Sequence, residues 1–197
     1  MCGGKSLRFG RSKALEILGG QSLIEIVIER LKALTDRILL VTSKESLAHL
    51  ASVKVETATD IYPGKGPLGG IYTGLVVSQT LLNVVVACDM PFLNVELLRY
   101  MIKLSNGYDA VVPKLEKGMI EPLHAVYSRN CVDSIKARLD RNDLRLRSFL
   151  DAVKVRYIAR EEYEPLDPQL LSFFNINEQS DFQRAIALAK RQITPQG

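Results

Sequence analysis

The sequence predicts an α/β fold in which helices cover both faces of a mostly parallel, Rossmann-like sheet, giving three layers. Two observations support this fold class. Short, continuous apolar runs, which are typical of strands buried on both faces, alternate along the chain with segments of helical period, and the clearest run is 83–89. The length of 197 residues suits one core. We therefore expect residues 1–197 to form a single domain.

The first half of the chain contains three expected strands and three expected helices. Ser22 and Glu25 form a capping box, and the apolar residues that follow recur at helical spacing for about three turns. Two prolines and four glycines within 60–70 predict an irregular loop. The remaining expectations are strand 37–42, a short helix 47–51, strand 53–56, helix 71–82 and strand 83–89.

The second half continues the alternation. Asn94 is expected to cap a helix over 95–104, and a second capping box at 180–183 is expected to start the last helix, which ends near residue 190. Acidic residues and prolines predict a loop over 161–168. The other expected elements are strands 108–113, 121–127 and 155–159 and helices 131–139 and 149–153.

The composition of residues 1–13 predicts a phosphate-binding loop. Gly3 and Gly4 remove two successive side chains, so that backbone N–H groups can approach an anion. Four cations follow within nine residues, before the first acidic residue: Lys5, Arg8, Arg11 and Lys13. A solvated basic arm is the alternative.

Two aspartates lie where ligands bind in such sheets, beyond the carboxyl ends of strands. Asp89 follows the run 83–88 and precedes a Met-Pro turn, so we expect its carboxylate to bind Mg²⁺. Asp60 and the glycines of 64–70 are expected to form a wall of a base or ribose pocket. The alternatives are an Asp89 that caps the next turn and an Asp60 in a surface turn.

Composition narrows the class of protein. The formal net charge of +4 fits acidic partners, and nucleotides satisfy that as well as nucleic acid does, but the aromatic residues do not alternate with basic ones as in single-strand binders. No apolar run approaches the ~18 residues of a membrane span, so we expect a cytoplasmic protein without membrane contact. Three scattered cysteines and two histidines give no metal-ligand spacing.

A fragment of a Walker A motif is also present at Gly4-Lys5-Ser6. A full phosphate-binding loop of that type needs another glycine five residues earlier and a strand ahead of it, and the sequence has neither. A kinase of this kind would depend on Lys5 rather than on Arg8 and Lys13.

Taken together, the motifs resemble the molybdenum cofactor guanylyltransferases, within the glycosyltransferase-A-like nucleotidyltransferases. That family opens with a strand followed by Leu-Ala-Gly-Gly-x-Ser-x-Arg-Met-Gly and a lysine, and Phe9 takes the methionine position here. The matching positions are Gly3, Gly4, Ser6, Arg8, Gly10 and Lys13, then Gly20, Leu23, Ile24 and Asp60, then 66–70, 88–92, 121–123 and 175–177. The resemblance covers nearly the whole chain.

The resemblance implies a Mg²⁺-dependent transfer of GMP from GTP to the terminal phosphate of molybdopterin cofactor, with release of pyrophosphate, on a fold of the nucleotide-diphospho-sugar transferase type. The implied roles are these: Gly3, Gly4, Lys13, Asp60 and Gly66 bind the nucleotide, Asp89 binds Mg²⁺, Arg8 and Lys13 stabilise charge growing on pyrophosphate, and Asn175 and Asn177 lie toward the acceptor. Molybdenum cofactor biosynthesis proteins and acceptor molybdoenzymes are the candidate protein partners.

Two departures from the family pattern carry expectations. The family's first strand precedes the glycine pair, whereas only Met1 and Cys2 do so here, so either the sequence starts short or the sheet lacks a central strand. Val41 lies where some relatives carry a polar residue, so that nucleotide contact is not carried over. A cytidylyltransferase, a nucleotidyltransferase for another phosphorylated acceptor and a non-catalytic cofactor-binding module remain the alternatives.

Overall fold

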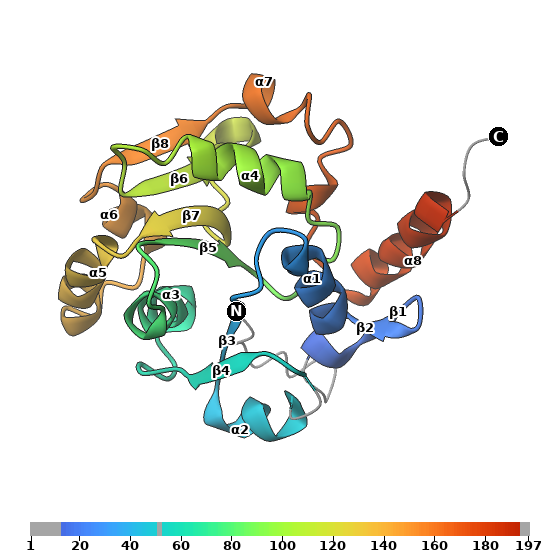
Figure 1. Ribbon diagram of the computed structural model, residues 1–197, viewed down its shortest axis with the longest axis horizontal. Coiled ribbons are helices and arrows are strands. Elements are labelled where there is room, and N and C mark those ends of the chain that lie inside the picture. The colour runs from blue at the N-terminus through green and yellow to red at the C-terminus, as the bar shows by residue number, and fades with distance from the viewer. Residues whose placement is uncertain (1–12, 51–52, 194–197) are drawn as a thin grey trace.

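The computed structural model describes residues 13–50 and 53–193 (Figure 1). Its largest sheet has four strands in the order β5-β7-β6-β8. Their bounds are β5 Leu82–Val86, β6 Ala110–Pro113, β7 His124–Ser128 and β8 Val155–Ile158. β6 and β8 run parallel, whereas β7 is antiparallel to both β5 and β6.

A second, parallel pair of strands lies on the β5 side of this sheet in Figure 1. It consists of β3 (Leu39–Thr42) and β4 (Glu56–Thr59), aligned so that Leu39 faces Glu56 and Thr42 faces Thr59. No described strand hydrogen-bonds β3 to β5. Among the described strands, the β3–β4 pair is therefore a sheet separate from the four-stranded one.

Helices cover both faces of the four-stranded sheet. On one face, α3 (Gly66–Val77) and α5 (Cys131–Asp140) pack on strand side chains that include Val85, Ala125 and Tyr127. On the other face α1 (Leu23–Lys32) and α4 (Val95–Lys103) pack on Val86, Val111 and Val126. Because neighbouring strand residues face opposite layers, the expected three-layer α/β fold is confirmed.

The other described elements complete the fold. They are η1 Lys13–Leu15, β1 Ile17–Leu18, β2 Gln21–Ser22, α2 Lys44–Leu47, η2 Ala48–Leu50, η3 Glu116–Gly118, α6 Leu146–Leu150, α7 Arg160–Tyr163, η4 Leu171–Phe173 and α8 Gln179–Ile193. The β1–β2 hairpin, which the sequence analysis missed, turns on Gly19 and Gly20 with φ of 63° and 93°. Two adjacent residues of positive φ are what a tight hairpin turn demands.

Two helix starts agree with the sequence. Ser22 and Glu25 form the expected capping box: the Ser22 hydroxyl accepts from the Glu25 N–H, and the Glu25 carboxylate accepts from the Ser22 N–H at 2.8 Å. Asn94 caps α4 through its side-chain oxygen, which accepts from the N–H groups of Glu96 and Leu97.

Several expected elements have other bounds in the structure: the helix expected over 71–82 ends at Val77, and the helix expected over 149–153 is α6, three residues earlier. Residues 66–70 belong to α3 and not to a loop, because proline is accepted in the first turn of a helix. The strand expected at 53–56 is β4, three residues later, and the loop expected at 161–168 opens on the single turn of α7. The last helix begins at Gln179, before the capping box expected at 180–183. The carboxylate of Asp181 instead accepts from the N–H groups of Asn177 and Glu178 at its start.

Within the described residues, no helix combines the length and the hydrophobicity that crossing a membrane requires.

Candidate functional site

The three side chains of Lys13, Asp89 and Asn177 meet at the carboxyl end of β5. The Lys13 ammonium lies 3.3 Å from Asp89 Oδ2 and donates to Asn177 Oδ1 at 3.0 Å. Lys13 and Asp89 keep 17% and 22% of their side-chain surface exposed, so solvent and ligands can reach the pair. We call these three residues the Lys13 cluster.

Backbone contacts hold the cluster together. β5 ends at Val86, and Asp89 follows in a turn. The Asp89 carbonyl accepts from the Ile176 N–H at 3.0 Å, which fixes the segment carrying Asn177 beside the strand end. The two backbone hydrogen bonds to Asp181 anchor the same segment at the start of α8, and they lower the pKa of the Asp181 carboxyl.

Glu121 and Asn175 lie next to the Lys13 cluster. The Glu121 carboxylate accepts from the Leu123 N–H at 3.2 Å and from Asn175 Nδ2 at 3.4 Å. Burial raises the pKa of Glu121, and the negative charge of Asp89 raises it further. The sequence analysis gave Glu121 no role, although the Glu-Pro-Leu motif that contains it was a signal that could have done so.

Asp60 is engaged within its own turn. Its Oδ1 accepts from the Tyr62 N–H at 3.0 Å and lies 3.0 Å from the hydroxyl of the fully buried Thr73. The Asp60 N–H donates to the Thr42 carbonyl at the end of β3. The Asp60 carboxylate therefore ties the turn after β4 to α3, and the Asp60 backbone ties that turn to the end of β3.

The start of α3 lies close behind that turn. A Cβ atom at Gly69 would come within 2.9 Å of the Tyr62 carbonyl, so only glycine lets the turn and the helix approach this closely. Lys65, before Gly66, provides no side-chain cap to the helix. The first N–H groups of α3 carry the partial positive charge that attracts anions to helix amino ends.

The structure brings together some of the expected site residues. Lys13 contacts both Asp89 and Asn177 directly. Asn175 lies two residues before Asn177 in the chain and hydrogen-bonds Glu121. Asp60 and Gly66 form a second group at the start of α3, with no hydrogen bond to the Lys13 cluster among the residues that the structure describes. Gly3, Gly4 and Arg8 lie outside the described residues.

The donor set around Asp89 suits a magnesium ion that is shared with a substrate. No group of three or more His, Cys, Asp or Glu side chains that could hold a metal occurs in 13–50 or 53–193. Mg²⁺ usually takes one or two carboxylates and fills its other positions with water and phosphate oxygens. Asp89 alone meets that protein contribution, with Glu121 as the neighbouring carboxylate.

A three-layer α/β sheet with a cation, a carboxylate and an amide gathered at a strand end defines a protein of the nucleotide-binding type. Comparison with known proteins narrows this class. Residues 1–158 match the family described as the MobA-like NTP transferase domain.

Similar proteins extend over the rest of the chain. The probable molybdenum cofactor guanylyltransferase of Pelotomaculum thermopropionicum is 34% identical over 98% of this chain and 93% of its own length. The molybdenum cofactor guanylyltransferase of Desulfosudis oleivorans is 34% identical over 96% and 94%. The crystal structure of molybdopterin-guanine dinucleotide biosynthesis protein A from Archaeoglobus fulgidus superposes with a TM-score of 0.84, at 30% identity and 96% coverage of both chains.

The chain belongs to the MobA-like NTP transferase family and, within it, to the molybdenum cofactor guanylyltransferases. It is a nucleotidyltransferase. The family resemblance expected from the motifs is thereby confirmed.

Proposed function

We propose that the protein transfers GMP from GTP to the terminal phosphate of molybdopterin cofactor and releases pyrophosphate. The observation that carries this proposal is the Lys13 cluster, in which a carboxylate and an amide each lie within 3.3 Å of one ammonium group at a strand end. The names of the relatives support GTP and a molybdopterin acceptor.

The chemistry needs positioning more than acid–base catalysis. An oxygen of the acceptor phosphate forms a bond to the α-phosphorus of GTP, while the bond from that phosphorus to the oxygen bridging to the β-phosphate breaks and pyrophosphate leaves. A phosphate oxygen is already ionised at neutral pH, so no strong base is required. The protein then acts by aligning the two phosphates and neutralising their charge.

Lys13 is the residue best suited to that neutralisation. An ammonium group has three N–H donors, and Asp89 and Asn177 account for two of them among the described residues. The third can be donated to a phosphate oxygen, so that Lys13 stabilises negative charge that grows on the leaving pyrophosphate. Arg8, outside the described residues, is proposed for the same task.

Asp89 is the proposed ligand of Mg²⁺. When bound there, the ion would draw charge from the phosphate oxygens as a Lewis acid. Asp89 itself also holds Lys13 in place through their ion pair, so the carboxylate orients the cation before the substrate arrives.

The other expected residues divide between the two substrates. Asp60 and Gly66, together with Gly3 and Gly4, are proposed for the nucleotide, since the start of α3 favours anions and Asp60 is held rigidly beside it. Asn175 and Asn177 are proposed for the acceptor side. Glu121 positions Asn175 through their 3.4 Å hydrogen bond.

The proposed partners are small molecules, a nucleotide and a pterin, with molybdenum cofactor biosynthesis proteins and acceptor molybdoenzymes as candidate protein partners. We place this activity in the cytoplasm, with no role for nucleic acid or a membrane.

Pyrophosphate release from each of the four ribonucleoside triphosphates, with and without molybdopterin, tests the proposal. With Mg²⁺ present, GTP and molybdopterin together are expected to release pyrophosphate, and either one alone is not. A preference for CTP would show that the protein transfers CMP and not GMP. Binding of GTP without any release would make the protein a non-catalytic module and overturn the proposal.

A further inference from the structure

Two connections of the chain carry the residues proposed for the reaction and lie side by side. Asp89 belongs to the connection between β5 and α4, residues 87–94. Asn175 and Asn177 belong to the connection between α7 and α8, residues 164–178. The two meet at the amino end of α4 (Figure 1). The proposed Mg²⁺ ligand and the amides proposed for the acceptor therefore stand on neighbouring segments of backbone.

Asn94 bonds both the helix that it starts and the neighbouring connection. Its side-chain oxygen accepts from the N–H groups of Glu96 and Leu97 and so caps α4. Its Nδ2 donates to the Leu166 carbonyl at 2.7 Å, and its backbone N–H donates to Ser172 Oγ at 2.9 Å. The cap holds α4, whereas the other two bonds reach across to the α7–α8 connection.

Asp167 holds Ser172 in place from within the α7–α8 connection. Its two carboxylate oxygens accept from the N–H groups of Leu171 and Ser172, at 3.2 and 2.8 Å. Asp167 is 6% exposed and Ser172 is fully buried. Buried polar groups that are bonded in this way keep one arrangement, because another would leave them without partners. We call Asn94, Asp167 and Ser172 the Asn94 clamp.

Two further contacts join the connections nearer to the proposed site. The Ile176 N–H donates to the Asp89 carbonyl at 3.0 Å. The rings of Phe92 and Phe174 pack edge to face, with their centroids 5.8 Å apart. Ile176 stands between the two asparagines of this connection, so the position of their backbone relative to Asp89 depends on how firmly the two connections are held together.

Transfer of a nucleotide needs a set distance between the groups that hold the two substrates. The oxygen of the acceptor phosphate must lie opposite the leaving pyrophosphate, and a displacement of about 1 Å can cost on the order of 100-fold in rate. The proposed function assigns Asp89 to the triphosphate and its Mg²⁺, and Asn175 and Asn177 to the acceptor. The role of the clamp rests on that assignment.

We propose that the Asn94 clamp sets the position of Asn175 and Asn177 relative to Asp89, so that Asn94 and Ser172 are positioning residues for the acceptor. The side chain of Ser172 is fully buried, and both polar groups of the Asn94 side chain are bonded within the protein. Loss of either residue therefore acts on the reaction through the backbone that carries the acceptor-side amides.

Asn94→Asp separates the clamp from the helix cap. Aspartate caps a helix as well as asparagine does, but it has no N–H to donate to the Leu166 carbonyl. The Ile176 amide, which bonds to Asp89, is expected to exchange with solvent at least about 10-fold faster in this variant, whereas amides in the middle of β6 and β7 keep their rates to within about 3-fold. The exchange is measured without substrates.

Ser172→Ala removes the other bond across the connections, because it leaves the Asn94 N–H without its acceptor. Faster exchange of the Ile176 amide is expected here too. In both variants kcat/KM for molybdopterin, measured at saturating GTP, is expected to fall by about 10- to 100-fold, while KM for GTP stays within about 2-fold of the parent value. A merely structural loss would not separate the two substrates in this way.

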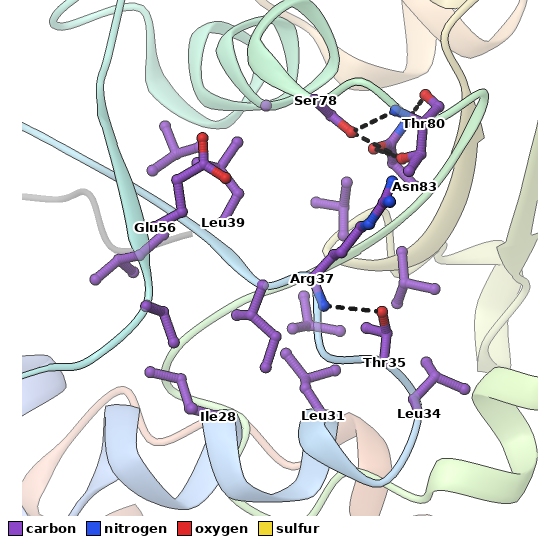
Figure 2. Close-up of a pocket in the computed structure, with 18 of the residues that line it drawn as sticks. Ile28, Leu31, Leu34, Thr35, Arg37, Leu39, Glu56, Ser78, Thr80 and Asn83 are labelled. Carbon is purple, nitrogen blue, oxygen red and sulfur yellow. Dashed lines mark hydrogen bonds between the residues drawn. The ribbon is translucent and has the colours of Figure 1, made fainter.

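Ser78→Ala is the matched control. Ser78 Oγ also accepts from a backbone N–H, that of Thr80 at 3.2 Å. The pair lies at the amino end of β5, beside a cavity of about 670 Å³ that residues of β3 and β5 line, and none of the clamp residues lines this cavity (Figure 2). Ser78→Ala should leave the exchange of Ile176 and both kinetic constants unchanged.

Unchanged exchange of the Ile176 amide in both Asn94→Asp and Ser172→Ala would overturn the proposal. So would faster exchange with normal kinetics, or an equal rise of KM for GTP and for molybdopterin, because the clamp would then hold the fold without placing the acceptor. A parent chain that releases no pyrophosphate from any nucleotide would overturn the proposed function alone, and exchange at Ile176 would still decide whether the clamp holds the two connections together.

Discussion

Asp89 and Asp60 both follow a strand at its carboxyl end, yet their carboxylates have different partners. Asp89 pairs with a cation, Lys13, which also donates to an amide from the far end of the chain. Asp60 accepts from the Tyr62 N–H in its own turn and neighbours the buried hydroxyl of Thr73. The carboxylate of Asp89 is thus held by a side chain from a distant part of the sequence, whereas that of Asp60 is held by groups within 13 residues of it.

The comparison leads to different expectations for the two carboxylates. Removing the charge of Asp89 should mainly change turnover, since its ion pair is partly exposed and adds little to stability. Removing the oxygen atoms of Asp60 should mainly change stability, since they satisfy a backbone N–H.

The largest effect is expected for Asp89→Asn. The amide keeps the shape of the side chain but loses the charge that holds Lys13 and that is proposed to bind Mg²⁺, so kcat for pyrophosphate release should fall by about 1,000-fold. The melting temperature should change little. Asp140→Asn is the matched control, because it removes the carboxylate of the exposed Lys136–Asp140 ion pair on α5 and should leave kcat unchanged. Near-normal turnover of Asp89→Asn would contradict the role of Asp89.

The strand that pairs with β5, near Asp89, carries a buried histidine. His124 on β7 is aligned with Val86, is fully buried and packs its ring 5.2 Å from that of Phe173. Burial lowers the pKa of His124 from 6.5 to about 3, and neither ring nitrogen has a hydrogen-bond partner among the described residues. The folded protein therefore keeps this ring neutral where the unfolded chain would protonate it.

This histidine should make the folded protein as a whole less stable at acid pH. As the pH falls below 6.5, only the unfolded chain takes up the proton, so stability is lost progressively down to about pH 3. Between pH 6.5 and about pH 5 the loss is about 2 kcal/mol. Urea unfolding of His124→Leu should lack this part of the pH dependence, with His49→Leu as the control. An unchanged dependence in His124→Leu would refute the assignment.

The smallest effect is expected at Asp60. Asp60→Ala leaves the Tyr62 N–H without its acceptor and should cost about 1–2 kcal/mol of unfolding free energy. Asp60→Asn keeps an oxygen for that bond and should be nearly as stable as the parent. If the carboxylate also contacts the nucleotide, Asp60→Asn will raise KM for GTP by about 10-fold. A normal KM would confine Asp60 to its turn.

Local signals in the sequence placed several elements correctly. The hydrogen bonds of the Ser22–Glu25 capping box and of the Asn94 cap join residues that are at most three apart, so the local sequence suffices to predict them. The loop predicted over 66–70 is wrong because glycine and proline usually break helices, whereas here they lie in the first turns of one. Pro67 sits in the first turn of α3 and Gly69 packs on Tyr62, and neither fact is visible without the fold.

The candidate site depends on contacts between distant parts of the chain. Lys13 is 76 residues from Asp89 and 164 from Asn177, so no local pattern predicts their meeting, and only the set of motifs shared with a family named all three. The sequence also does not predict that β7 is antiparallel to β5 and β6, because parallel and antiparallel strands can have the same apolar pattern.

The central claim is that Lys13 and Asp89 act as one unit on the phosphates, and a double-mutant cycle measures this most directly. kcat/KM for pyrophosphate release from GTP is determined for Lys13→Met, Asp89→Asn and the double variant. If the two residues act together, the double variant will be little worse than Asp89→Asn alone. Losses that multiply in the double variant would show two independent contributions and would contradict the claim.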